Sequence, residues 1–170
     1  MPEQFQTIVF LVRHGQTDHL YSQQMAVDNQ RQLTALGRDQ SKKVGQYLAQ
    51  FQPSALYSSP LERCLETAQL IKSGMNFDGP VVTASQLAEI YSPEPRLEAG
   101  ERGESIFKTI LTAHTGEQVV AVTHQYIIGY VVAEFLGVKY QQVLCDFADI
   151  YRLVFAGDKL VEATRLQPAK

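Results

Sequence analysis

The sequence predicts an α/β fold, a three-layer α/β/α sandwich with a mainly parallel central sheet. Short apolar segments at 7–12, 55–57 and 118–123 have the character of strands, and segments with helical spacing lie between them. Strands that alternate with helices usually form a parallel sheet covered by helices. The chain has 170 residues, of which 45% are hydrophobic, so we assign residues 1–170 to one domain with one substantial core.

The first half of the chain begins with an expected central strand. Residues 7–12 are almost wholly apolar, which is typical of a strand covered on both faces. The polar stretch 18–32 has no hydrophobic period and is expected to be a surface loop. Thr34 is expected to cap a helix with apolar residues at i, i+3, i+4 and i+7: Val44, Tyr47, Leu48 and Phe51. Residues 55–57 then form a short strand.

The segment SSPLERCLETAQLIK after this strand predicts a second helix. Ser59 is expected to be its N-cap, Pro60 its first residue and Glu62 the other half of a capping box. Arg63 lies opposite the apolar stripe, in the first turn of this helix. Ligands of open α/β sheets bind where a strand passes into its helix, so Arg63 is a candidate for binding.

The second half continues the alternation. Residues 81–83 are expected to form a strand, 85–103 an irregular segment, and 104–114 a helix. The strand QVVAVT follows, and then an apolar helix that Gly137 ends. A terminal hairpin around AGDK is expected to complete the sheet.

Four polar residues follow the predicted strands. Arg13 and His14 come directly after the first strand, His124 follows QVVAVT, and Arg63 lies shortly after a third strand. In a parallel sheet these positions share one edge, so the side chains are expected to form a cluster. Two imidazoles and two guanidiniums suit a dianionic group such as a phosphoryl, because arginine presents a planar fork of donors to its oxygens.

The sequence resembles the histidine phosphatase superfamily, which includes the cofactor-dependent phosphoglycerate mutases and many phosphatases. The resemblance is carried by five blocks in the expected order: LVRHGQT at 11–17, LTALGRDQ at 33–40, YSSPLERCLETA at 57–68, LAEI at 87–90 and VVAVTH at 119–124. A tripeptide such as RHG alone would not be specific for this family, but five blocks in the family's order are highly specific for it.

This resemblance implies a phosphatase that hydrolyses a phosphomonoester through a phosphohistidine intermediate. His14 would be the nucleophile, Arg13, Arg63 and His124 would hold the phosphoryl oxygens, and Glu89 would protonate the leaving oxygen. Physical chemistry supports these roles, because nearby arginines disfavour protonation of a nucleophilic histidine and attract the anionic substrate. A leaving alkoxide needs a proton, which a carboxylic acid can supply. One of the neighbouring glutamates could take this role instead of Glu89: Glu94, Glu98, Glu101 or Glu104.

Gln16 and Thr17 are expected to add hydrogen-bond donors near the phosphate. His14 and Asp18 could suggest metal ligands, but the neighbouring arginines would repel a divalent cation, so no metal is expected. No other cofactor is expected either, because phosphoryl transfer can be catalysed by charges already in position.

Two departures from the family pattern bear on activity. Leu20 stands where many mutase-like members carry an asparagine. His124 comes only 35 positions after Glu89, so any cap over the pocket is expected to be small. A more open pocket favours hydrolysis over transfer, and it would admit a phosphorylated small molecule or a phosphoprotein. Three arginines in the flanking loops are hypothesised to recognise further negative charge: Arg31, Arg96 and Arg102.

Other functions remain as alternatives. Within enzymes these are a phosphohistidine-protein phosphatase and, less favoured, a phosphoglycerate mutase. From another class, the chain could be a non-catalytic phospholigand-binding module. A nucleotide-binding domain is disfavoured, because no glycine-rich turn follows the first strand.

Composition limits the partners. The net charge is −3 and no run of lysines and arginines occurs, so neither nucleic acid nor a membrane surface is an expected partner. No secretion signal or membrane span is recognised, so a cytoplasmic location is expected. Cys64 and Cys145 are accordingly expected to be reduced, buried thiols. The oligomeric state and the physiological substrate are left open.

Overall fold

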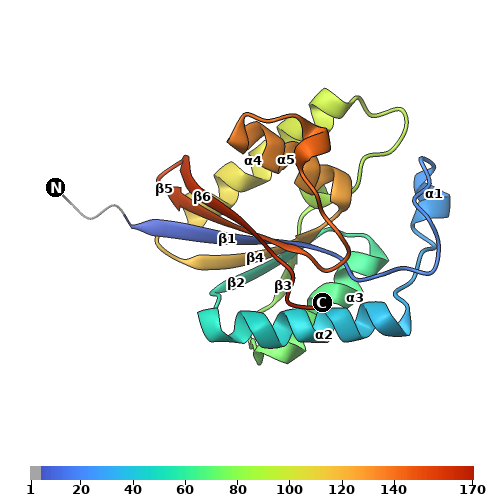
Figure 1. Cartoon of the computed structure of the whole chain (residues 1–170), viewed down its shortest axis with the longest axis horizontal. Helices are drawn as coiled ribbons and strands as arrows, with labels where there is room; N and C mark the ends of the chain where they lie inside the picture. The colour runs from blue at the N-terminus through green and yellow to red at the C-terminus, as the bar shows by residue number, and fades with distance from the viewer. Residues whose placement is uncertain (1–4) are drawn as a thin grey trace.

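A computed structural model describes residues 5–170 and has a six-stranded sheet with helices on both faces (Figure 1). The predicted three-layer α/β/α architecture is confirmed. The strands are β1 (Gln6–Arg13), β2 (Ala55–Ser58), β3 (Val81–Thr83), β4 (Gln118–Thr123), β5 (Ile150–Ala156) and β6 (Lys159–Leu166). The α-helices are α1 (Met25–Asp28), α2 (Ala35–Leu48), α3 (Glu62–Met75), α4 (Arg96–Ala113) and α5 (Gln125–Leu136).

The order of the strands is β3-β2-β4-β1-β5-β6. The first four are parallel, whereas β5 and β6 form the expected terminal hairpin and run antiparallel to their neighbours. Arg13 pairs with Thr123 and Ser58 with Val122, so β1, β2 and β4 end at the same edge. The residues that follow these strands therefore lie close together.

Two apolar cores flank the sheet because β1 buries both of its faces, as its continuous hydrophobicity predicts. Phe10 and Val12 belong to the core under α2 and α3, and Val9 and Leu11 belong to the core under α4 and α5. In Figure 1 these two helix pairs lie below and above the sheet. The sheet is thus packed on both faces, and its carboxyl edge carries the polar residues that follow β1, β2 and β4.

Of the two predicted helix starts, the one at Thr34 is confirmed and the one at Ser59 is wrong. Thr34 caps α2, and its Oγ1 accepts a hydrogen bond from Gly37 N at 3.0 Å. The capping box at Ser59, Pro60 and Glu62 is wrong, because α3 begins at Glu62 after Leu61 and has no side-chain cap. The Ser59 hydroxyl instead lies 2.7 Å from His124 Nε2, so it serves the polar cluster rather than a helix end.

Two segments expected to be irregular contain helices. The stretch 18–32 includes α1, which carries a fully buried Asp28. The segment 85–103 is helical from Arg96 onward, because α4 begins there. The first buried positions of α4 are small residues, so a search for regularly spaced large hydrophobic residues does not detect them. Gly103 is one of these positions, and it packs so closely on α5 that a Cβ there would lie 2.6 Å from the Val131 side chain.

Two further predictions concern the chain as a whole. The assignment of residues 1–170 to one domain stays a prediction, and the named strands all belong to one sheet. Cys64 and Cys145 are buried free thiols, as expected. Across residues 5–170, every helix is too short or too polar to cross a bilayer.

Candidate active site

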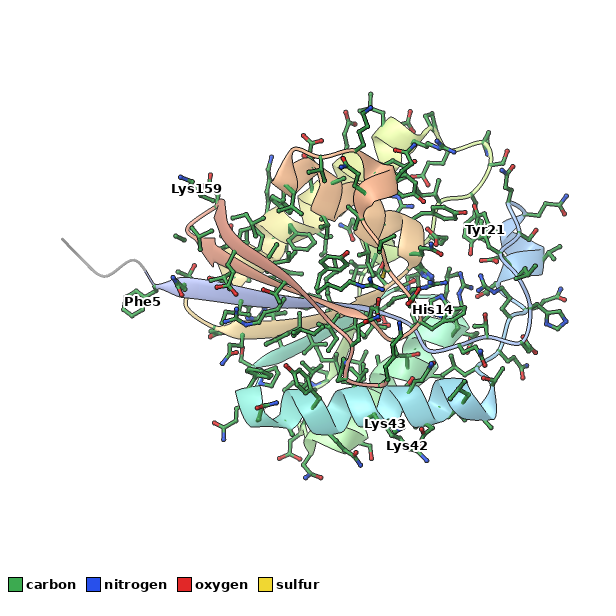
Figure 2. The ribbon with its side chains drawn as sticks, in the orientation of Figure 1. Phe5, His14, Tyr21, Lys42, Lys43 and Lys159 are labelled. Carbon is green, nitrogen blue, oxygen red and sulfur yellow. The ribbon has the colours of Figure 1, made fainter. Side chains whose placement is uncertain are left out.

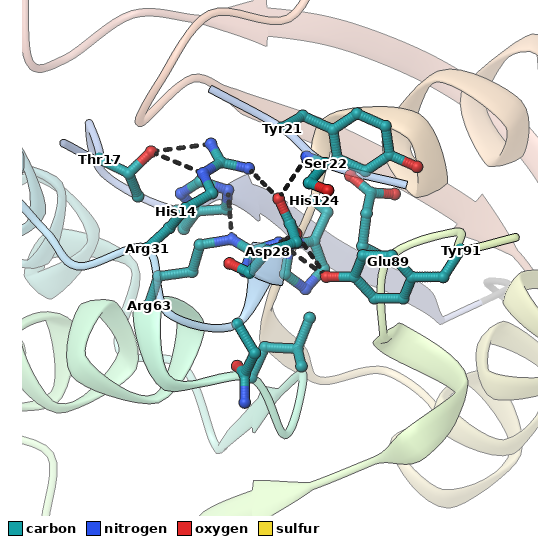
Figure 3. Close-up of polar contacts among 12 residues, drawn as sticks. His14, Thr17, Tyr21, Ser22, Asp28, Arg31, Arg63, Glu89, Tyr91 and His124 are labelled. Atoms are coloured by element: carbon teal, nitrogen blue, oxygen red, sulfur yellow. Dashed lines mark hydrogen bonds and ion pairs between the residues drawn. The ribbon is translucent and has the colours of Figure 1, made fainter. Parts of the chain in front are cut away.

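The structure brings the four predicted polar residues into one cluster at the carboxyl edge of the sheet. Figure 2 shows His14 at the end of β1 that lies opposite Phe5. The rings of His14 and His124 are 5.3 Å apart, and the guanidinium of Arg63 contacts both (Figure 3). Arg13, the last residue of β1, directly precedes His14.

His14 is held as one neutral tautomer. Its Nδ1 lies 2.8 Å from the carbonyl oxygen of Gly15, which can only accept, so Nδ1 carries the proton. Its Nε2 accepts a hydrogen bond from Arg63 Nε at 3.2 Å, so Nε2 has a lone pair. Burial, followed by the charges of Arg63 and Arg13, keeps the pKa of His14 well below its usual range. The imidazole is therefore neutral near pH 7.

His124 has the opposite tautomer. Its Nδ1 accepts from Arg63 Nη2 at 3.1 Å, and its Nε2 donates to the Ser59 hydroxyl at 2.7 Å. Burial, and then the charge of Arg63, lowers the pKa of His124 well below its usual range. Both ring nitrogens are thus engaged by protein groups.

The position of His14 depends on the backbone around Gly15. The amide of Gly15 donates to Thr67 Oγ1 at 3.2 Å, and the amide of His14 donates to Thr123 O at 3.1 Å. A Cβ at Gly15 would collide with the carbonyl of Gly37 at the start of α2. Only glycine allows this close approach, which explains the glycine of the RHG block.

Asp28 is a central residue that the sequence does not reveal. Its carboxylate is fully buried and accepts from Arg63 Nη2 at 2.7 Å, Arg31 Nη1 at 3.0 Å and the Tyr91 hydroxyl at 2.5 Å. Burial raises its pKa, but the hydrogen bond from Tyr91 and the other donors outweigh burial, so the net pKa is lowered. Asp28 is therefore ionised and fixes Arg63. It lies in a polar stretch without periodicity, so no sequence signal marks it.

A cavity of about 420 Å³ opens beside this cluster. Arg13, His14 and Glu89 line it, whereas Arg63 and His124 lie behind its wall. Arg13 Nη1 donates to Cys145 O at 2.7 Å, and its guanidinium lies 4.0 Å from the centre of the Phe147 ring. Arg13 Nε has no hydrogen-bond partner in the described part of the chain, so this cation keeps unused donor capacity.

Glu89 lines the same cavity and is 5% exposed. Its Oε1 accepts a hydrogen bond from Ile90 N at 2.9 Å. Burial raises the pKa of Glu89 to about 7, so this carboxyl can hold or release a proton near neutral pH. In residues 5–170 no group of three or more His, Cys, Asp or Glu side chains is arranged to hold a metal ion.

The remaining predicted residues have different neighbours. Gln16 and Thr17 both line the cavity, but Gln16 Oε1 accepts from Thr34 Oγ1 at 2.8 Å. The Thr17 hydroxyl accepts from Arg31 Nη2 at 2.7 Å and donates to His19 O at 3.2 Å. The single proton of the Thr17 hydroxyl is thus used within the protein.

Two of the three arginines hypothesised to recognise the substrate are occupied. Arg31 is buried and bonds Thr17 and Asp28. Arg102 forms a bidentate ion pair with Glu94, in which Nε lies 2.6 Å from Oε1 and Nη2 lies 3.0 Å from Oε2. Its guanidinium also donates to backbone carbonyl oxygens. Internal acceptors engage both guanidiniums, and a role of these two arginines in recognising the substrate stays a prediction. Arg96 is exposed and is in none of the ion pairs found in residues 5–170.

The family model for the histidine phosphatase superfamily (branch 1) matches residues 9–95 and 92–165. The chain belongs to the histidine phosphatase superfamily. The predicted family is thus confirmed, and with it the general class of phosphatase, whereas the small-cap branch stays a prediction.

Three known proteins illustrate the similarity. An uncharacterized phosphatase of Bacillus subtilis, PhoE, is 32% identical over 49% of this chain and 42% of its own length. An uncharacterized protein of Mycobacterium tuberculosis is 28% identical over 99% of both chains. The structure of a phosphoserine phosphatase mutant from Entamoeba histolytica superposes with a TM-score of 0.78 at 18% identity, over 96% of this chain and 98% of that chain. At 18% identity this similarity shows that the two chains share a fold, and it shows nothing about the activity.

Proposed function

We propose that this chain hydrolyses a phosphomonoester through a phosphohistidine intermediate on Nε2 of His14. One observation carries the proposal: a histidine held neutral, with its proton on Nδ1, lines a cavity together with a cation, Arg13, and a protonatable carboxyl, Glu89. A neutral imidazole has the lone pair that attack on phosphorus requires. Of the two histidines in the polar cluster, His14 is the one that lines this cavity.

In the first step the Nε2 lone pair forms a bond to phosphorus and the ester P–O bond breaks. The leaving oxygen takes the proton of Glu89, which becomes a carboxylate. In the second step this carboxylate takes a proton from water, the water oxygen bonds to phosphorus, and the P–N bond breaks. Inorganic phosphate leaves and His14 is neutral again. Proton transfer by Glu89 in both directions fits its pKa of about 7.

Arg13 and Arg63 stabilise the phosphoryl oxygens in this proposal. Arg13 lines the cavity with unused donor capacity. Arg63 Nε now donates to His14 Nε2, the atom that becomes bonded to phosphorus. A phosphoryl oxygen beside that atom can take over this hydrogen bond, so Arg63 would bind charge where it develops. The role of His124 as a further phosphate ligand stays a prediction, and its contact with Arg63 supports at least a role in holding that guanidinium.

The experiment is turnover of p-nitrophenyl phosphate in the presence of a metal chelator, with rapid acid-free quenching to trap the phosphoenzyme. The wild-type chain is expected to turn over and to form a phosphoenzyme that is labile in acid and stable in alkali. His14→Ala removes both signals. His114→Ala is the matched control, because His114 bonds Tyr57 and Glu117 away from the cavity. Phosphate binding without turnover would instead identify a phospholigand-binding module.

The substrate is a phosphorylated small molecule or a phosphoprotein. A phosphoserine phosphatase among proteins of the same fold supports the first class, and a panel of phosphate esters and phosphohistidine proteins separates the two. Turnover of phosphohistidine proteins alone would select the protein phosphatase. Phosphoryl transfer between phosphoglycerates, faster than their hydrolysis, would select the mutase. A cytoplasmic location remains part of this proposal, and the two buried free thiols are consistent with it.

A further inference from the structure

A second cavity, of about 240 Å³, lies next to the candidate active site. Tyr21 and Tyr126 line both cavities, so the two cavities are adjacent and these two rings lie between them. A molecule whose phosphoryl group is at His14 would reach the second cavity by extending over these rings. The walls come from the loop before α1, the segment after Glu89 and the start of α5.

Aromatic rings dominate these walls. Tyr21 packs edge-on against Tyr126, with ring centres 5.0 Å apart, and lies nearly parallel to Tyr91 at 6.2 Å. Tyr130, which also lines the cavity, stacks on Tyr140 with centres 4.5 Å apart. The Tyr21 hydroxyl donates to Ile90 O, which fixes its ring. Rings held in this way present faces and edges to a flat organic group.

The charge in this second cavity is positive. Arg96 and Glu94 are the charged residues that line it. Glu94 is neutralised by its two contacts with Arg102, whereas Arg96 joins none of the ion pairs within residues 5–170. Of the three arginines hypothesised to bind additional negative charge, Arg96 is thus the one left free to do so.

We propose that this cavity is the leaving-group subsite and that it takes a single aromatic ring bearing a second anionic group, whose charge pairs with Arg96. The inference rests on the proposed function, because it places the phosphoryl group at His14. Size agrees with it: a cavity of about 150 Å³ accommodates benzene, so 240 Å³ has room for one ring with a charged substituent. The substrate class is therefore an anionic aryl phosphate ester.

A pair of esters of matched shape tests the charge: 4-carboxyphenyl phosphate and 4-carbamoylphenyl phosphate. The wild-type chain is expected to prefer the carboxylate about 5-fold in kcat/KM, as one partly exposed ion pair allows, and the preference shrinks in high salt. Arg96→Gln abolishes the preference and leaves turnover of the carbamoyl ester within about 2-fold. Lys108→Gln, an equal loss of charge at an exposed position of α4, retains it.

The aromatic wall is tested separately with Tyr130→Leu, because Tyr130 lines the second cavity and not the cavity that holds His14. This variant is expected to lower kcat/KM for both aryl esters about 5-fold to 10-fold, in the range of a lost aromatic pair, while methyl phosphate, which cannot reach the second cavity, is unaffected. Equal turnover of both aryl esters by the wild type, or a preference that survives Arg96→Gln, overturns the subsite. Failure to hydrolyse p-nitrophenyl phosphate, methyl phosphate and both aryl esters overturns the proposed function instead.

Discussion

Arg63 Nε lies 3.2 Å from Nε2 of His14, and both side chains are buried. The guanidinium donates to the nitrogen that attacks phosphorus in the proposed reaction. A cation at this distance opposes protonation of the same nitrogen. Burial and this charge together keep the pKa of His14 well below its usual range, so the nucleophile is available without a separate base.

Replacing Arg63 by glutamine is expected to raise the pKa of His14, because the largest charge effect after burial is removed. The pKa is read from the imidazole NMR signals during a pH titration. We also expect kcat/KM for p-nitrophenyl phosphate to fall about 100-fold to 1000-fold, as for the loss of one transition-state donor. Arg38→Gln, at the surface, is the control. An unchanged His14 pKa in a folded Arg63→Gln chain would contradict this prediction.

Asp28 is expected to be among the most sensitive positions for stability. Its carboxylate is fully buried between Arg63 and Arg31, so Asp28→Ala leaves two guanidiniums without their shared anion. Removal of one partner from a buried ion pair costs about 3–5 kcal/mol. Urea unfolding followed by circular dichroism measures this loss. Asp39→Ala, which breaks only an exposed pair with Lys43, should change the free energy of unfolding by less than about 1 kcal/mol.

Glu89 is expected to produce the alkaline limb of the pH–rate profile. Its carboxyl must be protonated to act on the leaving oxygen, and burial raises its pKa to about 7. The value of kcat/KM for an alkyl phosphate should therefore fall above pH 7. Glu89→Gln should flatten this limb and lower the rate about 100-fold to 10,000-fold. Glu98→Gln removes an exposed carboxylate of α4 and should retain the wild-type profile. A falling limb that persists in Glu89→Gln belongs to another group.

The same carboxyl should make the free energy of unfolding depend on pH. The pKa is 4.5 in an ordinary carboxyl and about 7 in folded Glu89, so between these values the folded chain retains a proton that the unfolded chain has lost. The contribution of Glu89 to the free energy of unfolding is therefore fully present below about pH 4.5. This contribution is lost as the pH rises to about 7, and the loss is roughly 3 kcal/mol. Denaturant unfolding of Glu89→Gln and wild type at pH 4 and pH 8 measures this. Relative to the wild type, the free energy of unfolding of Glu89→Gln should be higher at pH 8 than at pH 4. If the difference between variant and wild type is the same at both pH values, the pKa of Glu89 is ordinary.

The edge at which the cluster forms could be predicted from the sequence because alternating strands and helices place successive strand ends together. Arg13 ends an apolar strand, and His14 and His124 directly follow apolar strands. The parallel order of these strands is therefore enough to bring the three residues together. Glu89 depends on the family resemblance, because it follows a short 3-10 helix rather than a strand.

The buried partners of the cluster could not be predicted in the same way. Asp28 and Arg31 lie in a polar segment whose composition is that of a solvent-exposed loop, yet each satisfies the charge of the other and both are buried. Asp28 also pairs with Arg63, which is 35 residues away, and a pairing at this separation leaves no periodic signal along the chain. Ser59 has the pattern of a helix cap, but its hydroxyl binds His124, which is 65 residues away.

Arg102 is expected to act on the reaction by positioning Glu89. Its guanidinium donates to the carbonyl oxygens of Gln86, Ala88 and Glu89 at 2.8, 2.6 and 3.0 Å, and so fixes the backbone that carries the carboxyl. A lysine keeps the charge but lacks the planar fork needed for these acceptors. We expect Arg102→Lys to lower kcat/KM for methyl phosphate, whose leaving oxygen is strongly basic, about 10-fold to 100-fold, as for a catalytic group displaced by about 1 Å.

Turnover of p-nitrophenyl phosphate by the Arg102→Lys variant should change less than about 3-fold, because its weakly basic leaving oxygen needs little help from an acid. The effect should also vanish in a Glu89→Gln background, since residues that act as one unit are not additive. Equal losses on both substrates would indicate general damage to the fold instead. The dependence on leaving-group basicity thus separates positioning of the acid from simple stabilisation of the segment.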